Sequence, residues 1–319
     1  MKVGFYSSHL CLRGTTVAIY DYARYNQEIL GNESVVFYDP MNSHNDPGVI
    51  NRFKSLCEVV ALDGIYSQAA LESQIESKKV SAAYIIKGGY KKDSVTPTNC
   101  KSLIHAISMA PPSEIHGDVW AYASYWLRNA CSQGTSVPVV PYMVNLPEIE
   151  EDMRLDLGIP KEALVFGRHG GLDTWNIHFA DQVVMAALRA RDDLYFLFQN
   201  TAVSFSHPRV IHLPTTSDTL EKTRFINTCN AMIHARHEGE SFGLACAEFS
   251  IRDKPILTWG GSRERSHLEI LGEKAHVYHS PQEMLDMIVN FTRKHHDYNC
   301  YREYSPQNVM SIFKKEFLE

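Results

Sequence analysis

The chain has 319 residues, of which 44% are hydrophobic and 21% are charged, and its formal net charge is −6. These values are typical of a globular protein long enough for two domains, and they exclude an overall basic surface for nucleic acid. No apolar run approaches the roughly 20 residues that span a bilayer, and the seven cysteines form no C-x-x-C pair, so we expect a cytoplasmic protein with free thiols.

Short β-rich runs alternate with helical stretches through the first half of the chain. A buried strand at residues 3–6 precedes a helix expected over about residues 16–30. The further strands expected in this half lie at residues 35–38, 59–62, 82–86 and 102–107. Alternation of strands with helices predicts a parallel sheet that is covered on both faces.

The alternation restarts after a proline-rich stretch from Val137 to Pro147, which predicts a linker. The elements expected beyond it are strands at residues 163–166, 194–198, 210–213, 231–235 and 255–258, and helices at residues 176–189, 217–229, from 281 and at about 305–317. We expect an N-terminal domain at 1–145, a second at 146–300, and a C-terminal helix at 301–319 that could pack back on the first. Two doubly wound, Rossmann-like domains predict a cleft, with ligands bound outside the carboxyl ends of the strands.

Two glutamates eight residues apart, Glu240 and Glu248, are the most informative feature of the chain. Glu240 follows a predicted strand and precedes a glycine turn, and Glu248 falls in the first turns of a predicted helix. Backbone N–H groups at a helix start attract phosphate, and eight residues at helical rise span at most roughly 12 Å, about the length of a sugar diphosphate. One carboxylate could bind sugar hydroxyls and the other a ribose. From the spacing alone, it is equally plausible that Glu240 is a solvated loop charge and that Glu248 caps or pairs on a helix.

Glycine-rich turns follow two of the predicted strands. In the run Gly167–Gly171, glycine lets the backbone approach a ligand, and Arg168 offers a forked donor for phosphate. Gly14, after the first strand, predicts a second phosphate or sugar contact. The alternatives are an ordinary loop with a surface arginine and, near Gly14, a helix start capped by Thr15 or Thr16.

Two histidines of the first half are candidate acid/base or hydrogen-bonding residues. His105 lies in a predicted strand, and His116 lies with Asp118 in a loop. A strand-end histidine could donate to a sugar hydroxyl or a phosphate oxygen. The alternatives are a core histidine at position 105 and a polar loop residue at position 116.

The motifs of several other classes of site do not occur. The chain contains no G-x-G-x-x-G, no G-x-x-x-x-G-K-[ST] and no H-E-x-x-H, so hydride transfer and P-loop hydrolysis lose support. It also contains no D-x-D pair and no Cys/His set with zinc spacing, so the sequence predicts no metal site.

The segment from Ile211 to Glu248 resembles the nucleotide-binding half of GT-B glycosyltransferases, above all the retaining family 4 group. In that family a strand, a turn, a helix and a second strand precede the run E-G-F-G-L and another glutamate, which is the order found here. The glycine–arginine loop opening the second half is also similar. The match covers about residues 160–295, whereas the N-terminal half agrees only in pattern.

The resemblance implies a role for each matching residue. Glu240 would lie beside the donor sugar and Glu248 would hold the ribose. His105 and His116 stay catalytic candidates on their positions alone. The implied donor-binding residues are Gly14, Gly167, Arg168, Pro214, Thr215, Ser241, Phe242, Gly243, Leu244 and Glu248. Among these, the amides of residues 242–244 and Arg168 would take the diphosphate, and the turn at residues 213–216 would meet the base.

The chain departs from the family pattern in three places. Residues 173–176 hold no lysine where the family often has one, so one diphosphate cation is missing or comes from elsewhere. Pro214 and Ser241 each stand where the family usually has glycine.

The resemblance implies a retaining, metal-independent glycosyltransferase that has no cofactor and uses a nucleotide-diphosphate sugar as co-substrate. Its acceptor would be a glycan, a lipid or a small molecule, with no nucleic-acid partner, no transmembrane segment and peripheral membrane contact left open. The alternatives are a nucleotide-sugar epimerase, with an acid/base pair drawn from His105, His116, Asp118 and Glu240, and a non-catalytic nucleotide-sugar binding protein.

Overall fold

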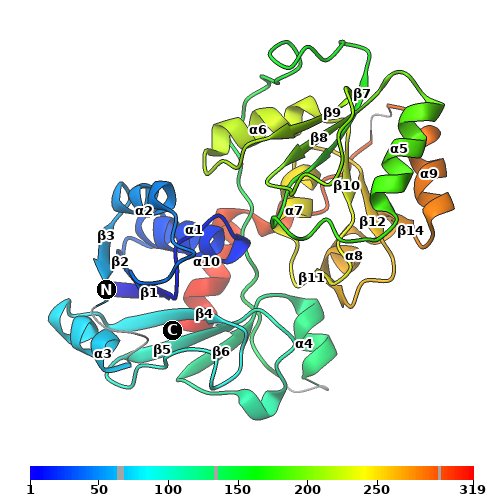
Figure 1. The fold of residues 1–319 in the computed structure, drawn as a ribbon. Coiled ribbons are helices and arrows are strands. Elements are labelled where there is room, and N and C mark those ends of the chain that lie inside the picture. The colour runs from blue at the N-terminus through cyan, green and yellow to red at the C-terminus, as the bar shows by residue number, and fades with distance from the viewer. Residues whose placement is uncertain (63–67, 133–135, 294–295) are drawn as a thin grey trace. The chain divides into compact units, whose positions relative to one another are not determined.

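The computed structural model describes residues 1–62, 68–132, 136–293 and 296–319. They form two compact units, one of residues 1–143 with 304–319 and the other of residues 144–303 (Figure 1). Each unit contains a six-stranded parallel sheet flanked by helices, which confirms the predicted α/β class.

The sheet of the first unit has the order β3-β2-β1-β4-β5-β6, with every neighbouring pair parallel. Its strands are β1 (Lys2–Ser7), β2 (Glu33–Tyr38), β3 (Glu58–Ala61), β4 (Ala82–Lys87), β5 (Lys101–Ala106) and β6 (Val119–Tyr122). The helices that precede residue 143 are α1 (Gly14–Glu28), α2 (Pro47–Lys54), α3 (Gln68–Ser77), α4 (Tyr125–Cys131) and the 3-10 turn η1 (Pro112–Glu114). The central strand β1 is buried on both faces because helices cover the sheet on each side.

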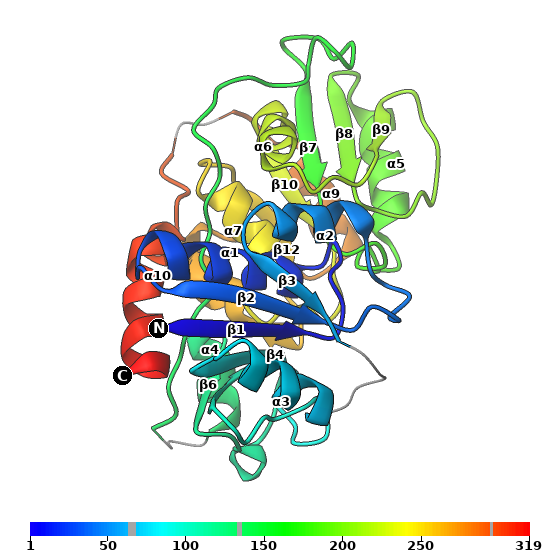
Figure 2. The ribbon, with the colours of Figure 1, turned by 90° about the vertical axis from the view of Figure 1, so that its left-hand side faces the viewer.

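The end of the chain belongs to this first unit. Helix α10 (Pro306–Phe313) starts with Ser305 as its N-cap and Pro306 at its first position, and a π-helical turn, η4 (Lys314–Leu318), follows it. Figure 2 shows α10 beside α1. The Phe313 ring stacks on Tyr22 at 5.0 Å, and Phe317 meets Tyr84 edge-on at 5.9 Å. The last helix therefore completes an aromatic core.

His105 lies in this same core and cannot serve as a substrate contact there. Its exposed fraction is 0%, and its Nδ1 lies 2.6 Å from the Tyr84 hydroxyl. Burial lowers the pKa of His105 to about 3. The prediction of His105 as a catalytic residue is wrong because β5 is buried on both faces, so a histidine in that strand packs into the core.

The buried His105 makes the stability of the first unit depend on pH. Because its folded-state pKa lies below the ordinary 6.5, the unfolded chain binds the proton more tightly between these values. Stability is full above about pH 6.5, and it falls on acidification by up to about 1.4 kcal/mol per pH unit. His105→Asn keeps an acceptor for the Tyr84 hydroxyl but does not titrate. We expect urea unfolding between pH 7.5 and 5 to show a shallower pH slope in this variant; an unchanged slope would contradict the assignment.

The sheet of the second unit has the order β14-β12-β10-β7-β8-β9. Its strands are β7 (Leu164–Arg168), β8 (Leu194–Gln199), β9 (Val210–Leu213), β10 (Ala231–His234), β12 (Ile256–Trp259) and β14 (His276–Tyr278). The helices are α5 (Ala180–Ala190), α6 (Thr219–Thr228), α7 (Leu244–Ser250), α8 (Ser266–Leu271) and α9 (Pro281–Val289), with the 3-10 turns η2 (Gly272–Lys274) and η3 (Arg302–Tyr304). Counted along the chain, both sheets have the strand order 3-2-1-4-5-6 of Rossmann folds.

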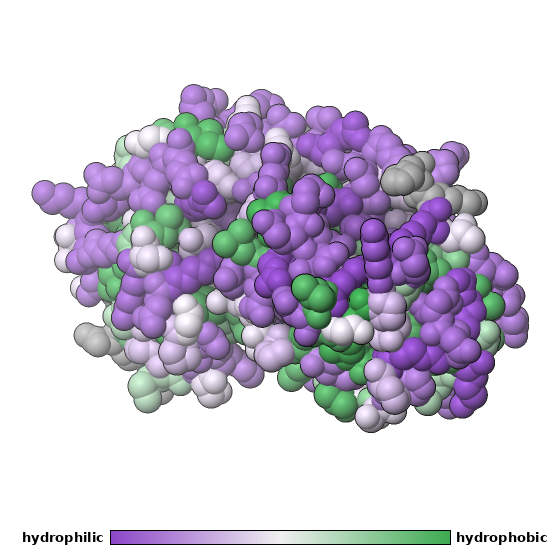
Figure 3. Space-filling model, turned by 90° about the horizontal axis from the view of Figure 1, so that it is seen from above, coloured by the Kyte–Doolittle hydropathy of each residue, from purple (hydrophilic) through white to green (hydrophobic). Residues whose placement is uncertain are grey.

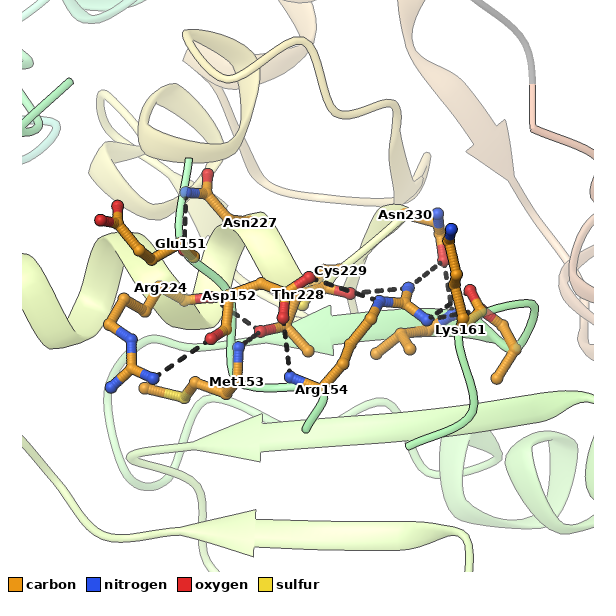
Figure 4. A network of polar contacts seen from close by, with 12 residues as sticks. Glu151, Asp152, Met153, Arg154, Lys161, Arg224, Asn227, Thr228, Cys229 and Asn230 are labelled. Atoms are coloured by element: carbon orange, nitrogen blue, oxygen red, sulfur yellow. Dashed lines mark hydrogen bonds and ion pairs between the residues drawn. The ribbon is translucent and has the colours of Figure 1, made fainter. Parts of the chain in front are cut away.

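The segment that opens the second unit has no helix or strand before β7, yet it is tightly bonded to that unit (Figure 4). Arg154 donates to the Thr228 carbonyl at 2.9 Å and to Asn230 Oδ1 at 3.0 Å. The Met153 amide donates to Thr228 Oγ1 at 2.8 Å. These contacts fix residues 153–154 to the end of α6.

Hydrophilic residues cover most of the surface visible in Figure 3, with smaller groups of hydrophobic residues between them. The large hydrophobic side chains with the greatest exposure are Leu155, Met41 and Val203. Within residues 1–62, 68–132, 136–293 and 296–319, none of the helices has the length and hydropathy needed to cross a membrane.

Candidate functional site

Glu240 is fixed by a two-stranded parallel sheet at the carboxyl end of β10. Strands β11 (Gly239–Glu240) and β13 (Glu264–Arg265) pair in register. Gly239 has φ +77°, and a Cβ there would lie 2.0 Å from the Glu264 carbonyl oxygen. Only glycine permits this close approach. The strand pairing that it allows holds the backbone of Glu240 against Arg265.

The carboxylate of Glu240 is held at both of its oxygens. Its Oε1 lies 3.1 Å from His234 Nε2, and its Oε2 accepts from Arg236 Nη1 at 3.0 Å. Burial alone would raise the pKa of Glu240, but the hydrogen bond from His234 and the charge of Arg236 outweigh burial and lower that pKa to about 2. Glu240 is therefore a charged, oriented acceptor at neutral pH, with a side chain that is 17% exposed.

The turn after Glu240 requires Gly243 as its last residue. Gly243 has φ +90°, and a Cβ there would lie 3.0 Å from His267 Cβ and 3.3 Å from Glu240 Cβ. Phe242 is buried, packs edge-on against Tyr301 at 5.6 Å and accepts the Tyr301 hydroxyl on its carbonyl at 3.0 Å. The Phe242 side chain therefore anchors the turn.

Helix α7 begins at Leu244, so the predicted helix start is confirmed. The first amides of a helix have no acceptor inside it and are open to other partners. The helix has only 7 residues, so its dipole adds little to this end.

Glu248, on α7, is held in the same way as Glu240. Its Oε2 lies 2.9 Å from His169 Nε2, and its Oε1 accepts from the Lys222 ammonium. Burial would raise the pKa of Glu248, but Lys222 and then His169 lower that pKa to about 2. Each glutamate is thus kept ionised by one histidine and one cation.

Sequence reasoning missed these partners. His234 and Arg236 stand six and four residues before Glu240. His234 ends β10 and Arg236 lies in the loop after it, and no motif marks either residue. Lys222 comes from α6, 26 residues before Glu248, at a place where no motif requires a lysine.

Arg168 and Gly167 both make contacts inside the second unit. Arg168 is 3% exposed. Its Nη1 donates to the Asn200 carbonyl at 3.1 Å and to Thr201 Oγ1, and its Nη2 donates to the Gly171 carbonyl at 3.0 Å and to Thr174 Oγ1. The guanidinium therefore joins two loops, and its contact with the diphosphate stays a prediction. At Gly167, a Cβ would lie 2.2 Å from Cys229 Sγ, so this glycine serves core packing.

The other predicted donor contacts lie at the surface. Gly14 is the exposed first residue of α1, and Pro214 and Thr215 are exposed in the turn after β9. Ser241 and Leu244 are half-buried beside Glu240 and at the start of α7. Their donor contacts stay predictions.

Ser241 is also the centre of a G-x-S-x-G run, the sequence pattern of α/β-hydrolase nucleophiles. In those enzymes the serine sits on a strained turn next to a histidine. Among the described residues, the non-glycine positions with positive φ are Lys79, Asn200 and Asp253, and no hydrogen bond joins Ser241 to a histidine. Ser241 is therefore not arranged as a hydrolase nucleophile.

His116 and Asp118 make local contacts in the first unit. His116 Nδ1 lies 2.6 Å from the Glu114 carbonyl oxygen, and its Nε2 lies 3.0 Å from Lys87 Nζ. Asp118 accepts from the Ser102 amide at 2.7 Å, near the amino end of β5. Because sites form at carboxyl ends, Asp118 is not an acid/base group of such a site. The catalytic role of His116 stays a prediction.

The whole chain is similar to solved structures of glycosyltransferases. A glycosyltransferase from Rickettsia africae ESF-5 matches with a TM-score of 0.65 and 14% identity over 99% of this chain and 94% of that one. Anabaena Alr3699/HepE, solved with UDP and glucose, matches with a TM-score of 0.65 and 12% identity over 99% and 95%. MurG from Acinetobacter baumannii matches with a TM-score of 0.53 and 11% identity over 100% and 99%.

No family model matches the sequence, and no curated protein matches it. At identities this low the similarity shows the fold, which is the two-domain GT-B fold of glycosyltransferases.

Proposed function

We propose that the chain is a retaining, metal-independent glycosyltransferase of the family 4 kind, which transfers a sugar from a nucleotide-diphosphate donor. One observation carries the proposal: the half-buried Glu240 and the buried Glu248 are each held ionised by a histidine and a cation at the carboxyl edge of the second sheet of a GT-B fold. HepE, which shares the fold, was solved in complex with UDP-glucose. This supports a uridine nucleotide as the first donor to test.

In this proposal each glutamate accepts hydrogen bonds from hydroxyl groups. Glu240 would bind the donor sugar and Glu248 the ribose, since each ionised carboxylate has lone pairs left beyond its two internal contacts. The amides of Gly243 and Leu244 would contact the diphosphate between them.

Two cations of the site support transfer without a metal ion. The leaving diphosphate gains negative charge as the glycosidic bond breaks, and preorganised positive groups stabilise such charge. Lys222 is already beside Glu248. Arg236 uses Nη1 for Glu240 and has a buried Nε without a hydrogen-bond partner, so its guanidinium retains a donor.

In the proposed mechanism the anomeric configuration is retained without a covalent intermediate on Glu240. A carboxylate that already accepts from His234 and Arg236 is a weak nucleophile. We therefore place no covalent intermediate on Glu240. The family resemblance supports attack by the acceptor from the face that the diphosphate leaves. The epimerase alternative has lost two of its acid/base candidates, because His105 is in the core and Asp118 caps β5.

A nucleotide screen tests donor binding. A ligand at 100 times its Kd stabilises the folded state by about 2.7 kcal/mol, which raises the Tm of a unit of this size by about 5–10 °C. We expect UDP or a UDP-sugar to give a shift of this size in a screen that includes GDP, ADP and their sugar conjugates. No shift with any of these nucleotides would contradict the proposal. Incubation without an acceptor then separates slow free-sugar release, expected of a transferase, from epimer formation.

A further inference from the structure

A chain of hydrogen bonds runs into the protein from Glu240. His234 Nε2 lies 3.1 Å from Glu240 Oε1, and His234 Nδ1 lies 2.8 Å from Thr258 Oγ1. Thr258 Oγ1 in turn lies 3.0 Å from His267 Nε2. Thr258 and His267 are both 0% exposed. These hydrogen bonds therefore join β10, β12 and α8 to the Glu240 carboxylate through side chains that are at most 5% exposed.

The proton positions in this series of hydrogen bonds are determined by His267, its innermost residue. His267 Nδ1 is buried and has no hydrogen-bond partner, so a proton there would have no acceptor. His267 is also kept neutral, because burial lowers its pKa to about 3. Its proton therefore sits on Nε2 and is donated to Thr258 Oγ1.

The directions of the remaining hydrogen bonds follow because the Thr258 hydroxyl has a single proton. With Oγ1 accepting from His267, that proton is donated to His234 Nδ1. His234 then carries its own proton on Nε2, where it is donated to Glu240 Oε1. In this order each side-chain N–H and O–H of His267, Thr258 and His234 has an acceptor, and among the histidine nitrogens only His267 Nδ1 lacks a partner.

We propose that His234 is a positioning residue for Glu240, and that Thr258 and His267 select the His234 tautomer able to hold the carboxylate. The inference rests on the proposed function, because it assigns Glu240 to the donor sugar. Gly243 adds a geometric constraint: a Cβ there would lie 3.0 Å from His267 Cβ and 3.3 Å from Glu240 Cβ. The turn that carries Glu240 thus packs directly on His267, the last residue of the hydrogen-bonded series.

Two substitutions of His234 separate positioning from packing. Gln can place an amide N–H near the position of Nε2, whereas Leu fills similar space without a donor. A displacement of about 1 Å in a catalytic group lowers rate by roughly 100-fold. We expect His234→Leu to lower kcat/KM for the donor by about that factor and His234→Gln to recover to within about 10-fold of the wild type. Equal activity in the two variants, at equal folded fraction, would overturn the inference.

A matched pair of threonine substitutions tests the second step. Thr258→Val and Thr228→Val each remove a hydroxyl from a fully buried threonine of the same unit. Thr228 Oγ1 accepts from the Met153 amide and donates to the Arg224 carbonyl, among the contacts that fix residues 153–154 to α6 (Figure 4). We expect Thr258→Val to lower kcat/KM by roughly 10-fold, the size usual for lost support of a site residue, and Thr228→Val to leave it within about 2-fold. The same loss in both variants would mean that only stability is measured.

A spectroscopic readout decides the proton order without any turnover. Nitrogen-15 chemical shifts of the imidazole rings should show the His234 proton at Nε2 in the wild type and a mixture of tautomers in Thr258→Val. A His234 protonated only at Nδ1 in the wild type would overturn the inference. If the spectra show the predicted His234 tautomer but the wild type transfers no sugar from any nucleotide donor, the proposed function is wrong and the assigned hydrogen-bond directions are correct. If the wild type is active and His234→Leu matches it, the positioning role falls and the function stands.

Discussion

Replacing Glu240 by alanine is expected to lower the turnover number for sugar transfer by about 100- to 1,000-fold. The substitution removes an oriented acceptor from the donor sugar, and losses of this size follow the removal of one preorganised electrostatic group. Glu240→Gln keeps the volume and one oxygen but loses the charge, so we expect an intermediate loss. Initial rates with the UDP-sugar that gives the largest thermal shift provide the measurement.

Glu238 is a matched control for this experiment. It lies two residues before Glu240, its side chain is 55% exposed, and it accepts from Asn176 Nδ2 at 3.1 Å. Glu238→Gln should leave turnover within about 2-fold of wild type, since exposed substitutions away from a site have small effects. Near-wild-type turnover in Glu240→Ala would remove Glu240 from the mechanism.

Replacing Glu248 by alanine is expected to destabilise the second unit by about 3–5 kcal/mol. The carboxylate is almost fully buried between Lys222 and His169, and removal of one partner from a buried ion pair leaves the other charge uncompensated. The same variant should lose the thermal shift with nucleotide, because Glu248 is the proposed ribose contact. Urea unfolding and the nucleotide screen measure the two effects separately.

A double-mutant cycle identifies the source of this loss. Glu248→Gln combined with Lys222→Met removes both charges, so we expect the double variant to be more stable than the sum of the single losses predicts. The exposed pair Arg24–Glu28 is the control, with side chains 40% and 47% exposed; Glu28→Ala should change stability by less than about 1 kcal/mol. Additive losses at Glu248 and Lys222 would contradict the ion-pair account.

The contribution of Glu248 also has a predicted pH range. Its folded-state pKa of about 2 lies below the ordinary value of 4.5. The stabilisation is therefore complete above about pH 4.5 and is lost as the pH falls towards 2. Acidification from pH 7 to 5 consequently acts through buried histidines such as His105 and not through this glutamate.

Much of the fold could be predicted because buried parallel strands are short apolar runs. The runs at residues 194–198 and 210–213 correspond closely to β8 (Leu194–Gln199) and β9 (Val210–Leu213). β6 (Val119–Tyr122) was missed because it follows a loop of prolines and glycine and is only four residues long. β11 and β13 could not be predicted, since two-residue strands have no periodicity and depend on the close approach of Gly239 to Glu264.

The site could be predicted only in part, for a physical reason. Glu240 and Glu248 stand out by their spacing around a glycine turn. The residues that hold them lie on other helices and strands, which only the folded structure brings next to the two glutamates. Lys222 approaches from α6, and Thr258 from β12. Arg168 illustrates another limit of sequence reasoning. Arginine is a residue type suited to phosphate, but in the folded structure the Arg168 guanidinium donates to loop carbonyls and threonine hydroxyls.

A crystal structure with the preferred nucleotide sugar is the most direct test of the account. We predict the ribose hydroxyls within hydrogen-bond distance of Glu248, a hydroxyl of the transferred sugar on Glu240, and the diphosphate at the amides of Gly243 and Leu244. A donor bound elsewhere in the second unit, with neither carboxylate in contact with it, would contradict the account.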